Sequence, residues 1–103
     1  MNVSSRVHEI GPELWETRDM LRAAFPNGVA EADYVPLLAV LYEGMSFRGV
    51  ANVMANFTGK PYASVYNDVL GATSDEEPTE DAKRSVRDIL RKHGFDAWVA
   101  KED

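Results

Sequence analysis

The chain has 103 residues, of which 45% are apolar and 27% charged, with no cysteine and a formal net charge of -6 at pH 7. This length suits one small domain, because such a chain buries enough surface for one hydrophobic core but not for two. The lack of cysteine excludes disulfides and thiol chemistry. The excess of acidic residues argues against a nonspecific nucleic-acid binder, which normally carries a positive field.

The sequence also limits the location and the boundaries of the domain. It contains no apolar run long enough for a signal peptide or for crossing a bilayer, so we expect a cytoplasmic protein without membrane contact. We expect residues 10–100 to form a single helical domain. Residues 1–9 and 101–103 are predicted to be flexible ends.

Apolar residues recur with helical spacing from the first segment onward. The first predicted helix covers about residues 12–24 and stops before Pro26-Asn27-Gly28, which favour a turn. The second, residues 34–42, is almost entirely apolar, and a buried strand would also fit it. We favour a helix because Asp33 is a good N-cap and Pro36 is tolerated in a first turn but not in a central strand.

Two further helices follow in the middle of the chain. The third is predicted at about residues 47–57, with Ser46 as its N-cap and Thr58-Gly59 as its exit. The fourth covers about residues 61–70, because Pro61 suits a first helical turn.

The fifth predicted helix, about residues 80–93, has the clearest end signals. Thr79 can cap its start, and Gly94 stands where a left-handed exit is expected. Phe95 would then turn inward and carry Trp98 toward the body of the domain. The fold class that follows is all-α, a single compact bundle of about five short helices.

The fifth helix also concentrates the positive charge of the chain. Five of the eleven cationic residues lie between residues 82 and 93. Four of these fall opposite the apolar stripe and predict an exposed basic ridge: Lys83, Arg84, Arg87 and Arg91. Arg84, Arg87 and Arg91 could contact a phosphate backbone or an acidic partner. Helix electrostatics alone, with pairs at four-residue spacing such as Glu80–Arg84 and Asp88–Lys92, would also explain the pattern.

A helix-turn-helix is the specific form of a DNA-binding hypothesis. The third and fourth helices are joined by a short turn, with Lys60 and Asn67 available to touch DNA. The fourth helix carries no arginine, whereas a recognition helix usually presents arginine, lysine, glutamine or asparagine to the bases. The pattern therefore disfavours DNA reading.

Aromatic side chains form the second candidate surface. We expect Trp15, Tyr42, Tyr66 and Trp98 to reach the rim of the bundle. If they form one exposed patch, they would mark a surface for a protein partner. The alternative is a ring of half-buried side chains, which is common in a small bundle.

No residue pattern predicts catalysis, a metal site or a cofactor. His8 with Glu9 and Glu13 is the one cluster near a helix that combines histidine with carboxylates, but His8 is expected in a frayed start. His93 fits a dipole partner at a helix end. Neither a nucleophile elbow nor a phosphate loop occurs. We therefore predict a non-enzymatic protein with no metal and no cofactor.

Several runs resemble one protein family. The runs are Phe25-Pro26-Asn27-Gly28-Val29, residues 33–41 (DYVPLLAVL) and the acidic stretch at residues 69–81 (VLGATSDEEPTED). They resemble the domain-of-unknown-function family 3349, known mainly from mycobacteria and related actinobacteria. With Gly94-Phe95, where the family usually has Gly-Trp, the likeness covers most of residues 14–96. The resemblance implies a small all-helical domain and brings no assigned catalytic residues.

The functional hypothesis is a macromolecular-interaction module that binds a protein through an exposed face, as a monomer or weak homodimer. The candidate binding residues are Arg84, Arg87, Arg91, Trp15, Tyr42 and Tyr66. The alternative is a nucleic-acid binder that uses the basic ridge. A hydrolase or metal enzyme is the third hypothesis.

Overall fold

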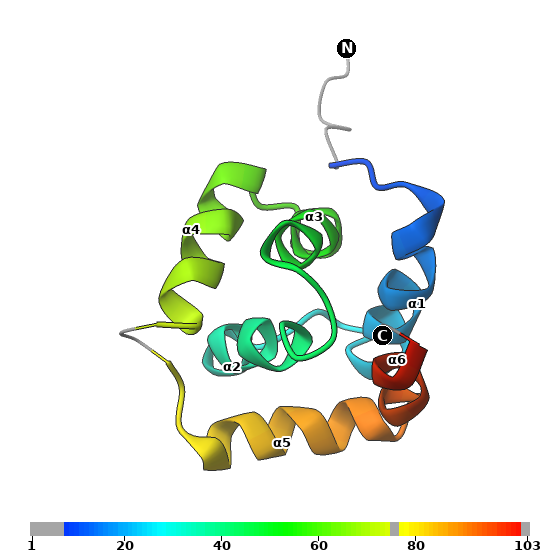
Figure 1. Cartoon of the computed structure of the whole chain (residues 1–103), viewed down its shortest axis with the longest axis vertical. Coiled ribbons are helices and arrows are strands. Elements are labelled where there is room, and N and C mark those ends of the chain that lie inside the picture. Colours follow the sequence, from blue (N-terminus) through cyan, green and yellow to red (C-terminus); the bar gives the residue numbers. More distant parts are fainter. Residues whose placement is uncertain (1–7, 75–76, 102–103) are drawn as a thin grey trace.

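The computed structural model describes residues 8–74 and 77–101. In this part of the chain there are six α-helices, a short 3-10 turn before the first of them, and no strand. The elements are η2 (Pro12–Leu14), α1 (Trp15–Ala24), α2 (Glu31–Leu41), α3 (Phe47–Thr58), α4 (Tyr62–Ala72), α5 (Glu80–Arg91) and α6 (Phe95–Lys101) (Figure 1). The all-helical class is confirmed for these residues, and the predicted number of helices is too small by one.

The first helix begins later than predicted. Pro12 opens a 3-10 turn instead of an α-helix, because the amide of Leu14 donates to the carbonyl of Gly11, three residues back. The α-helix itself begins only at Trp15, whose amide still donates to the carbonyl of Pro12, three residues back. The end of α1 matches the prediction, and Gly28, with a φ of 88°, lies in the turn that follows.

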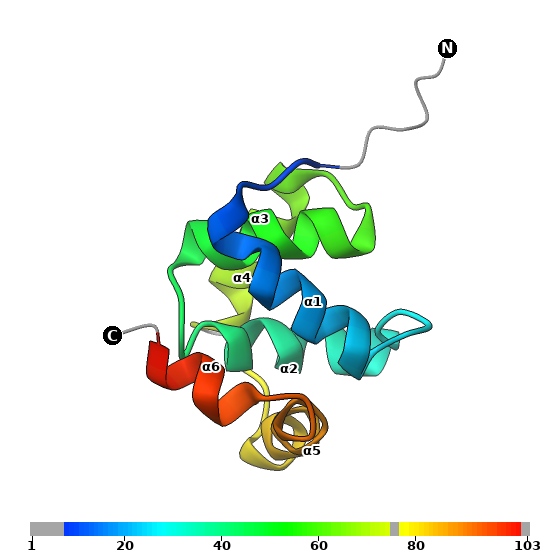
Figure 2. The same cartoon turned by 90° about the vertical axis from the view of Figure 1, so that its right-hand side faces the viewer.

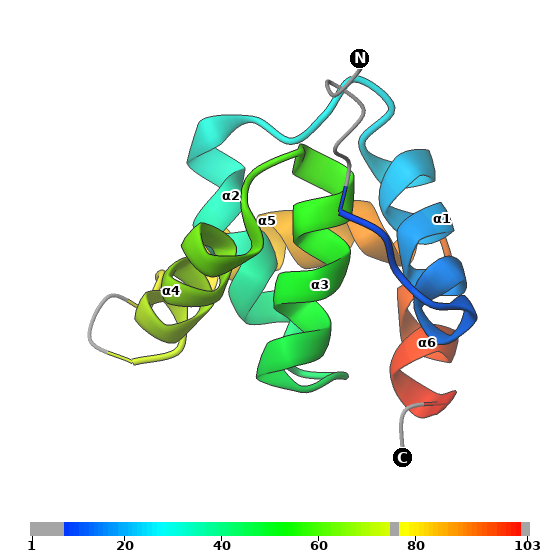
Figure 3. The same cartoon turned by 90° about the horizontal axis from the view of Figure 1, so that it is seen from above.

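The second helix lies at the centre of the bundle, between α4 and α5, which both pack against it (Figures 1 and 3). The buried residues of α2 are Tyr34, Pro36, Leu37, Leu38, Ala39, Val40 and Leu41. A helix that is apolar on nearly every side needs such a place. The prediction of a helix is confirmed over residues 34–41, with Tyr42 as the C-cap, and the strand alternative is wrong.

The predicted start of α2 is wrong by one turn. Ala30, in an extended conformation, is the N-cap, and its side chain makes no capping hydrogen bond. Asp33 lies inside the first turn, where its amide donates to the carbonyl of Ala30 at 2.9 Å. Glu31 and Asp33 nevertheless favour the helix there, since negative side chains near an N-terminus are stabilised by the helix dipole.

The predicted helix caps at Ser46 and Thr79 and the predicted helix exits at Gly59 and Gly94 are confirmed. The hydroxyl oxygens of Ser46 and Thr79 each accept a hydrogen bond from a backbone amide three residues further on, at 3.0 and 3.1 Å. Gly59 and Gly94 adopt left-handed conformations with φ of 82° and 93°. Pro61 is the N-cap of α4 and not a residue of its first turn.

The helix α6, absent from the predicted set, packs near α1 and the end of α5 (Figure 2). It begins directly after Gly94 and buries Phe95 and Trp98. The indole nitrogen Nε1 of Trp98 donates to the hydroxyl of Thr17 at 2.7 Å. The prediction that Phe95 turns inward and carries Trp98 toward the body of the domain is confirmed, since both residues are 3% exposed. The separate prediction that Trp98 reaches the rim is wrong, because its side chain joins α6 to the core.

His8 is held against α3 and α4. Its Nε2 lies 2.7 Å from Oδ1 of Asn52, and its carbonyl accepts a hydrogen bond from Nδ2 of Asn56 at 2.7 Å. Its ring also stacks on Tyr62 at a centroid distance of 5.4 Å. The expectation that His8 lies in a frayed start is thus wrong, because three side chains of α3 and α4 hold it.

The structure describes only part of the segments that were predicted to be flexible. Of residues 1–9 and 101–103, residues 1–7 and 102–103 lie outside the described part of the chain. None of the helices in the described part is long and apolar enough to span a membrane.

Candidate functional site

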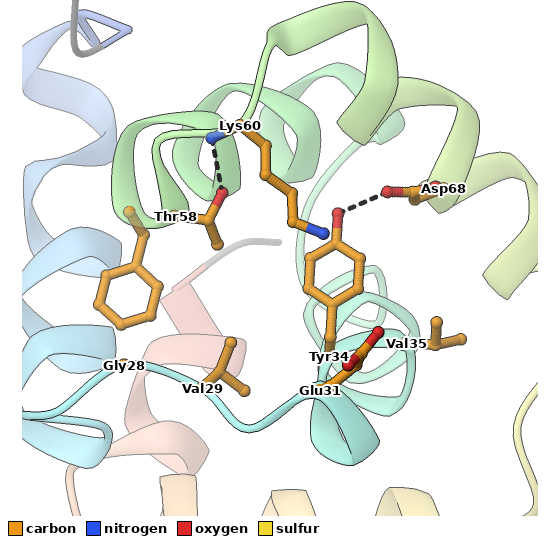
Figure 4. Close-up of a pocket in the computed structure, with 9 residues that line it drawn as sticks. Gly28, Val29, Glu31, Tyr34, Val35, Thr58, Lys60 and Asp68 are labelled. Carbon is orange, nitrogen blue, oxygen red and sulfur yellow. Dashed lines mark hydrogen bonds between the residues drawn. The ribbon is translucent and has the colours of Figure 1, made fainter. Parts of the chain in front are cut away.

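A pocket with a volume of about 600 Å³ opens between the start of α2, the end of α3 and α4. Its size lies within the range of small-ligand sites, roughly 300 to 1,000 Å³. It is lined by Gly28, Val29, Glu31, Tyr34, Val35, Phe57, Thr58, Lys60 and Asp68 (Figure 4). The walls therefore combine apolar side chains with a phenol, two carboxylates and one ammonium group.

Two glycine turns frame the pocket. Gly28 reverses the chain between α1 and α2, and Gly59 ends α3 and leads into Lys60. Both glycines have a positive φ, and a Cβ added at either would meet no other atom within 4 Å. Backbone conformation, not close packing, therefore requires glycine at the two positions.

The central polar contact of the pocket joins α2 to α4. The hydroxyl of Tyr34 donates a hydrogen bond to Oδ2 of Asp68 at 2.7 Å. Burial, and then the hydrogen bond to the Asp68 carboxylate, raise the pKa of Tyr34 well above its ordinary value of 10.0. The phenol is therefore a protonated donor at neutral pH, and Asp68 has a second oxygen that can accept another donor.

The ammonium group of Lys60 lies over the face of the Tyr34 ring. Its Nζ is 4.0 Å from the ring centroid, a cation–π distance. Figure 4 shows the lysine side chain reaching across the pocket from the turn after α3. The backbone amide of Lys60 also donates to the hydroxyl of Thr58 at 3.1 Å. Thr58 thus helps to fix the turn from which the lysine extends.

The polar groups of the pocket place a protonated phenol between a carboxylate and an ammonium group. A phenol whose pKa is raised far above neutrality is a poor proton-transfer group at physiological pH. Tyr34 and Asp68 instead offer an aromatic face beside a fixed negative charge. Among residues 8–74 and 77–101, no group of three or more histidine, aspartate or glutamate side chains is placed to hold a metal ion.

The predicted basic ridge loses one of its members. Lys83 is 7% exposed and lies on the same side of α5 as the buried Val86 and Leu90. Its ammonium group reaches Glu77 at 2.8 Å and Glu80 at 3.0 Å. The prediction of an exposed Lys83 is therefore wrong, because its aliphatic stem packs against the bundle while its charge meets two carboxylates at the edge.

The three arginines of the ridge do lie on one side of α5, but each is paired with a carboxylate, and the side chain of Arg87 is only 19% exposed, although it was predicted to be exposed. Arg84 meets Asp81 at 2.9 Å. Arg91 meets Asp96 at 3.2 Å and Asp88 at 3.8 Å, and Arg87 pairs with Glu43 of the α2–α3 connection. The observed pairs within α5 have three-residue spacing, in place of the predicted Glu80–Arg84 and Asp88–Lys92. No arginine of the ridge lines the pocket.

The aromatic candidates lie on different elements, each against its own neighbour. Trp15 is 49% exposed at the start of α1. Tyr42, at the end of α2, is 41% exposed and stacks on Phe47 at 4.6 Å between centroids. Tyr66 is half-buried on α4 and stacks on Tyr62 at 6.0 Å. A single patch that contains all three stays a prediction.

The residues of the pocket were not among the predicted site residues. Tyr34 belongs to an apolar run that predicts core, while Lys60 and Asp68 stand in the segments considered for DNA contact. No local pattern marks the Tyr34–Asp68 hydrogen bond, whose partners are 34 positions apart. The nearest usable signal is the pair of turns around Gly28 and Gly59.

The fold and the pocket define a small all-helical domain with a mixed apolar and charged pocket at the start of α2. The chain belongs to the family described as Protein of unknown function (DUF3349), whose sequence pattern matches residues 14–98. The match confirms the resemblance and includes every residue that lines the pocket. No curated protein and no solved structure matches the chain.

Proposed function

We propose that this chain is a non-enzymatic interaction module that binds another protein, and that the pocket at Tyr34 receives a side chain of that partner. The observation that carries the proposal is the pocket itself. It is large enough for an amino-acid side chain, with apolar walls and a few polar groups that can orient a guest. The interface residues that contribute most to binding typically fill pockets of this kind.

Exposed apolar side chains elsewhere on the domain also support a protein partner. Trp15, Tyr42 and Leu70 are 49%, 41% and 40% exposed. Aromatic residues are enriched in protein interfaces compared with the remaining surface. A partner that fills the pocket could cover neighbouring surface as well, which a small metabolite could not do.

Binding of a nucleic acid is less well supported. It would rely on Arg84, Arg87 and Arg91, whose guanidinium groups each lie near a carboxylate. A phosphate would have to compete with those carboxylates, against a chain with a formal net charge of -6. We therefore place protein binding ahead of nucleic-acid binding.

The setting of the proposed function is the cytoplasm, with the chain acting as a monomer or a weak homodimer. A chain without cysteine suits a reducing compartment, where disulfides contribute no stability. Monomer and dimer can be separated by sedimentation at several protein concentrations.

The test uses a bulky substitution that fills the pocket and a matched one beside it. Val29 lines the pocket, whereas Ala30 is exposed and does not. Val29→Trp should abolish capture of the partner by the immobilised chain, and Ala30→Trp should preserve it. Thermal unfolding checks that both variants fold.

The captured protein is then purified and titrated into the isotope-labelled wild-type chain. Shifts of the backbone amides at Tyr34, Lys60 and Asp68 are the expected result, and this measurement does not depend on the stability of Val29→Trp. The proposal is overturned if no protein is captured in a Val29-dependent way, or if the shifts lie away from the pocket.

A further inference from the structure

We propose that the pocket selects a cationic side chain of its partner, an arginine or a lysine, and that Lys60 occupies the cation site in the free protein. This inference rests on the proposed function and adds the chemical class of the guest. The partner's cation would replace the ammonium group of Lys60 over Tyr34, and Lys60 would move out to solvent.

The first argument is that the site already holds a cation. The Nζ atom of Lys60 lies 4.0 Å from the centroid of the Tyr34 ring, within the distance of about 6 Å at which a cation is attracted to an aromatic face. The chain's own lysine thus has the same chemistry as the proposed guest. An arginine would suit the ring at least as well, because its planar guanidinium also stacks on aromatic faces.

The second argument is the charge around the ring. The hydroxyl of Tyr34 donates to Asp68 at 2.7 Å, which fixes a carboxylate at the hydroxyl end of the ring. Glu31 supplies a second carboxylate on the pocket wall. With Lys60 over the ring, the pocket lining carries two carboxylates and one ammonium group. When Lys60 moves out, only the two negative charges remain. A cationic guest restores the balance, whereas an anionic guest would meet both carboxylates.

The third argument is that Lys60 can leave. It is exposed, and it extends from the turn that follows Gly59. Among the described residues, no carboxylate lies within salt-bridge distance of its ammonium group, so no direct ion pair with them holds it over the ring. A single cation–π contact at an exposed site is weak. Release of the lysine therefore costs little compared with what a partner can supply from a larger interface.

The apolar walls fit the same guest. Val29, Val35 and Phe57 line the pocket beside the charged groups. Arginine and lysine both carry a methylene stem that packs on apolar surface while the charged end stays among polar groups. The net charge of -6 would also raise the rate at which a basic segment approaches the domain.

The test uses three short peptides that differ only in their central residue: arginine, citrulline or glutamate. Citrulline keeps the shape of arginine without its charge. Each peptide is titrated into the isotope-labelled full chain, and the amide shifts of Tyr34 and Asp68 are followed. We expect the arginine peptide to bind at these residues and to bind more tightly than the citrulline peptide.

Lys60→Met is the decisive variant, with Lys92→Met as its matched control. Lys92 is an exposed lysine at the end of α5 that does not line the pocket. Removal of the internal competitor in Lys60→Met should tighten the arginine peptide by about two- to fivefold, the range expected for one exposed cation–π contact. Lys92→Met removes the same charge elsewhere and should leave the affinity nearly unchanged.

Different results separate this inference from the proposed function. If Lys60→Met weakens or does not change binding of the arginine peptide, Lys60 does not compete for the cation site and the inference is wrong. If the citrulline or glutamate peptide binds at least as tightly as the arginine peptide, the cationic guest is wrong. The cationic guest is also wrong if neither the wild type nor Lys60→Met binds the arginine peptide at millimolar concentration. A captured protein that shifts Tyr34 and depends on Val29 would still support the proposed function.

Discussion

Trp98 and Thr17 form a buried hydrogen bond that closes the domain. The indole Nε1 donates to the threonine hydroxyl at 2.7 Å, and the two residues are 3% and 2% exposed. They come from α6 and α1, 81 positions apart in the sequence. Because a buried indole N–H needs an acceptor, the contact fixes how the last helix sits on the first.

Thr17→Val should destabilise the domain by about 1 to 3 kcal/mol, the cost of a buried donor left without its partner. Valine keeps the volume of threonine but removes the acceptor. Urea unfolding followed by circular dichroism measures the difference. Thr17→Ser, which retains the oxygen, should lose clearly less stability, and equal losses in the two variants would contradict the role given to the hydrogen bond.

Gly44→Ala should also destabilise the domain, for a steric reason. A Cβ at Gly44 would lie 2.7 Å from Cζ3 of Trp98, an atom of a rigid ring. We expect a loss of about 1 to 3 kcal/mol, typical of an overpacked core. In a Trp98→Leu background the same substitution should cost less, because the ring atoms are gone. Additive losses in the double variant would argue against the clash.

Gly94→Val should lower stability by about 1 kcal/mol or more through the backbone alone. A Cβ at this position meets no atom within 4 Å, but φ is 93°. Gly94→Asn should cost less than Gly94→Val, since asparagine adopts left-handed conformations more readily. Melting temperatures of the two variants give the comparison, and a melting temperature unchanged by valine would refute the conformational requirement.

The ion pairs of Lys83 predict a pH dependence of stability at both ends of the scale. Hydrogen bonds to Glu77 and then Glu80 raise the pKa of Lys83 above 10.5, and the hydrogen bond from Lys83 lowers the pKa of Glu80 below 4.5. The stabilisation that Lys83 contributes is fully present below the pKa that this lysine has in the unfolded chain. It is lost as the pH rises through the higher pKa that it has in the folded chain. The stabilisation that Glu80 contributes is fully present above the pKa that this glutamate has in the unfolded chain, and it is lost as the pH falls through the lower pKa that it has in the folded chain.

Lys83→Met should therefore flatten both the acid and the alkaline decline in the free energy of unfolding. Urea titrations of the wild type and the variant across the pH range measure the two slopes. Lys92→Met provides the control for removal of a lysine charge. Wild-type slopes that persist in Lys83→Met would show that other groups cause the decline.

Asp68→Asn should lower the pKa of Tyr34 toward its ordinary value without reaching it. Burial raises this pKa most, and the Asp68 hydrogen bond and charge raise it further. The phenol carbon of Tyr34, followed by NMR during an alkaline titration, reports the change. An unchanged titration in the variant would mean that burial alone sets the value. Because the pKa is raised on folding, stability contributed by Tyr34 is present below pH 10.0 and is lost above it.

The parts of the fold that were predicted correctly depend on short stretches of sequence. Ser46 and Thr79 act as caps because the hydroxyl and the amide it accepts from are only three residues apart. The apolar run of α2 can likewise be recognised from consecutive residues alone. Asp33 fails as a cap because the extended Ala30 starts the helix one turn earlier, and no side-chain signal marks alanine as an N-cap.

The errors concern contacts between distant segments. The prediction places Lys83 on the surface because of its charge, although it precedes Val86 and Leu90 by three and seven residues and so shares their side of α5. How deeply it is buried depends on where α5 meets the rest of the bundle. The burial of Trp98 likewise depends on distant residues: Thr17 accepts its hydrogen bond, and Gly44 leaves room for its ring because it has no side chain. The pocket could not be predicted either, because its walls come from three separate stretches, residues 28–35, residues 57–60 and Asp68, which meet only after folding.

The central place of α2 has a consequence for motion in the native state. Seven of its residues, from Tyr34 to Leu41, are buried, so this helix cannot open to water while its neighbours stay packed. Its amide protons should be the slowest in the chain to exchange with deuterium, at a rate set by global unfolding. Tyr34 stands at the edge of that most protected segment, and so one wall of the pocket is built on the part of the protein that moves least.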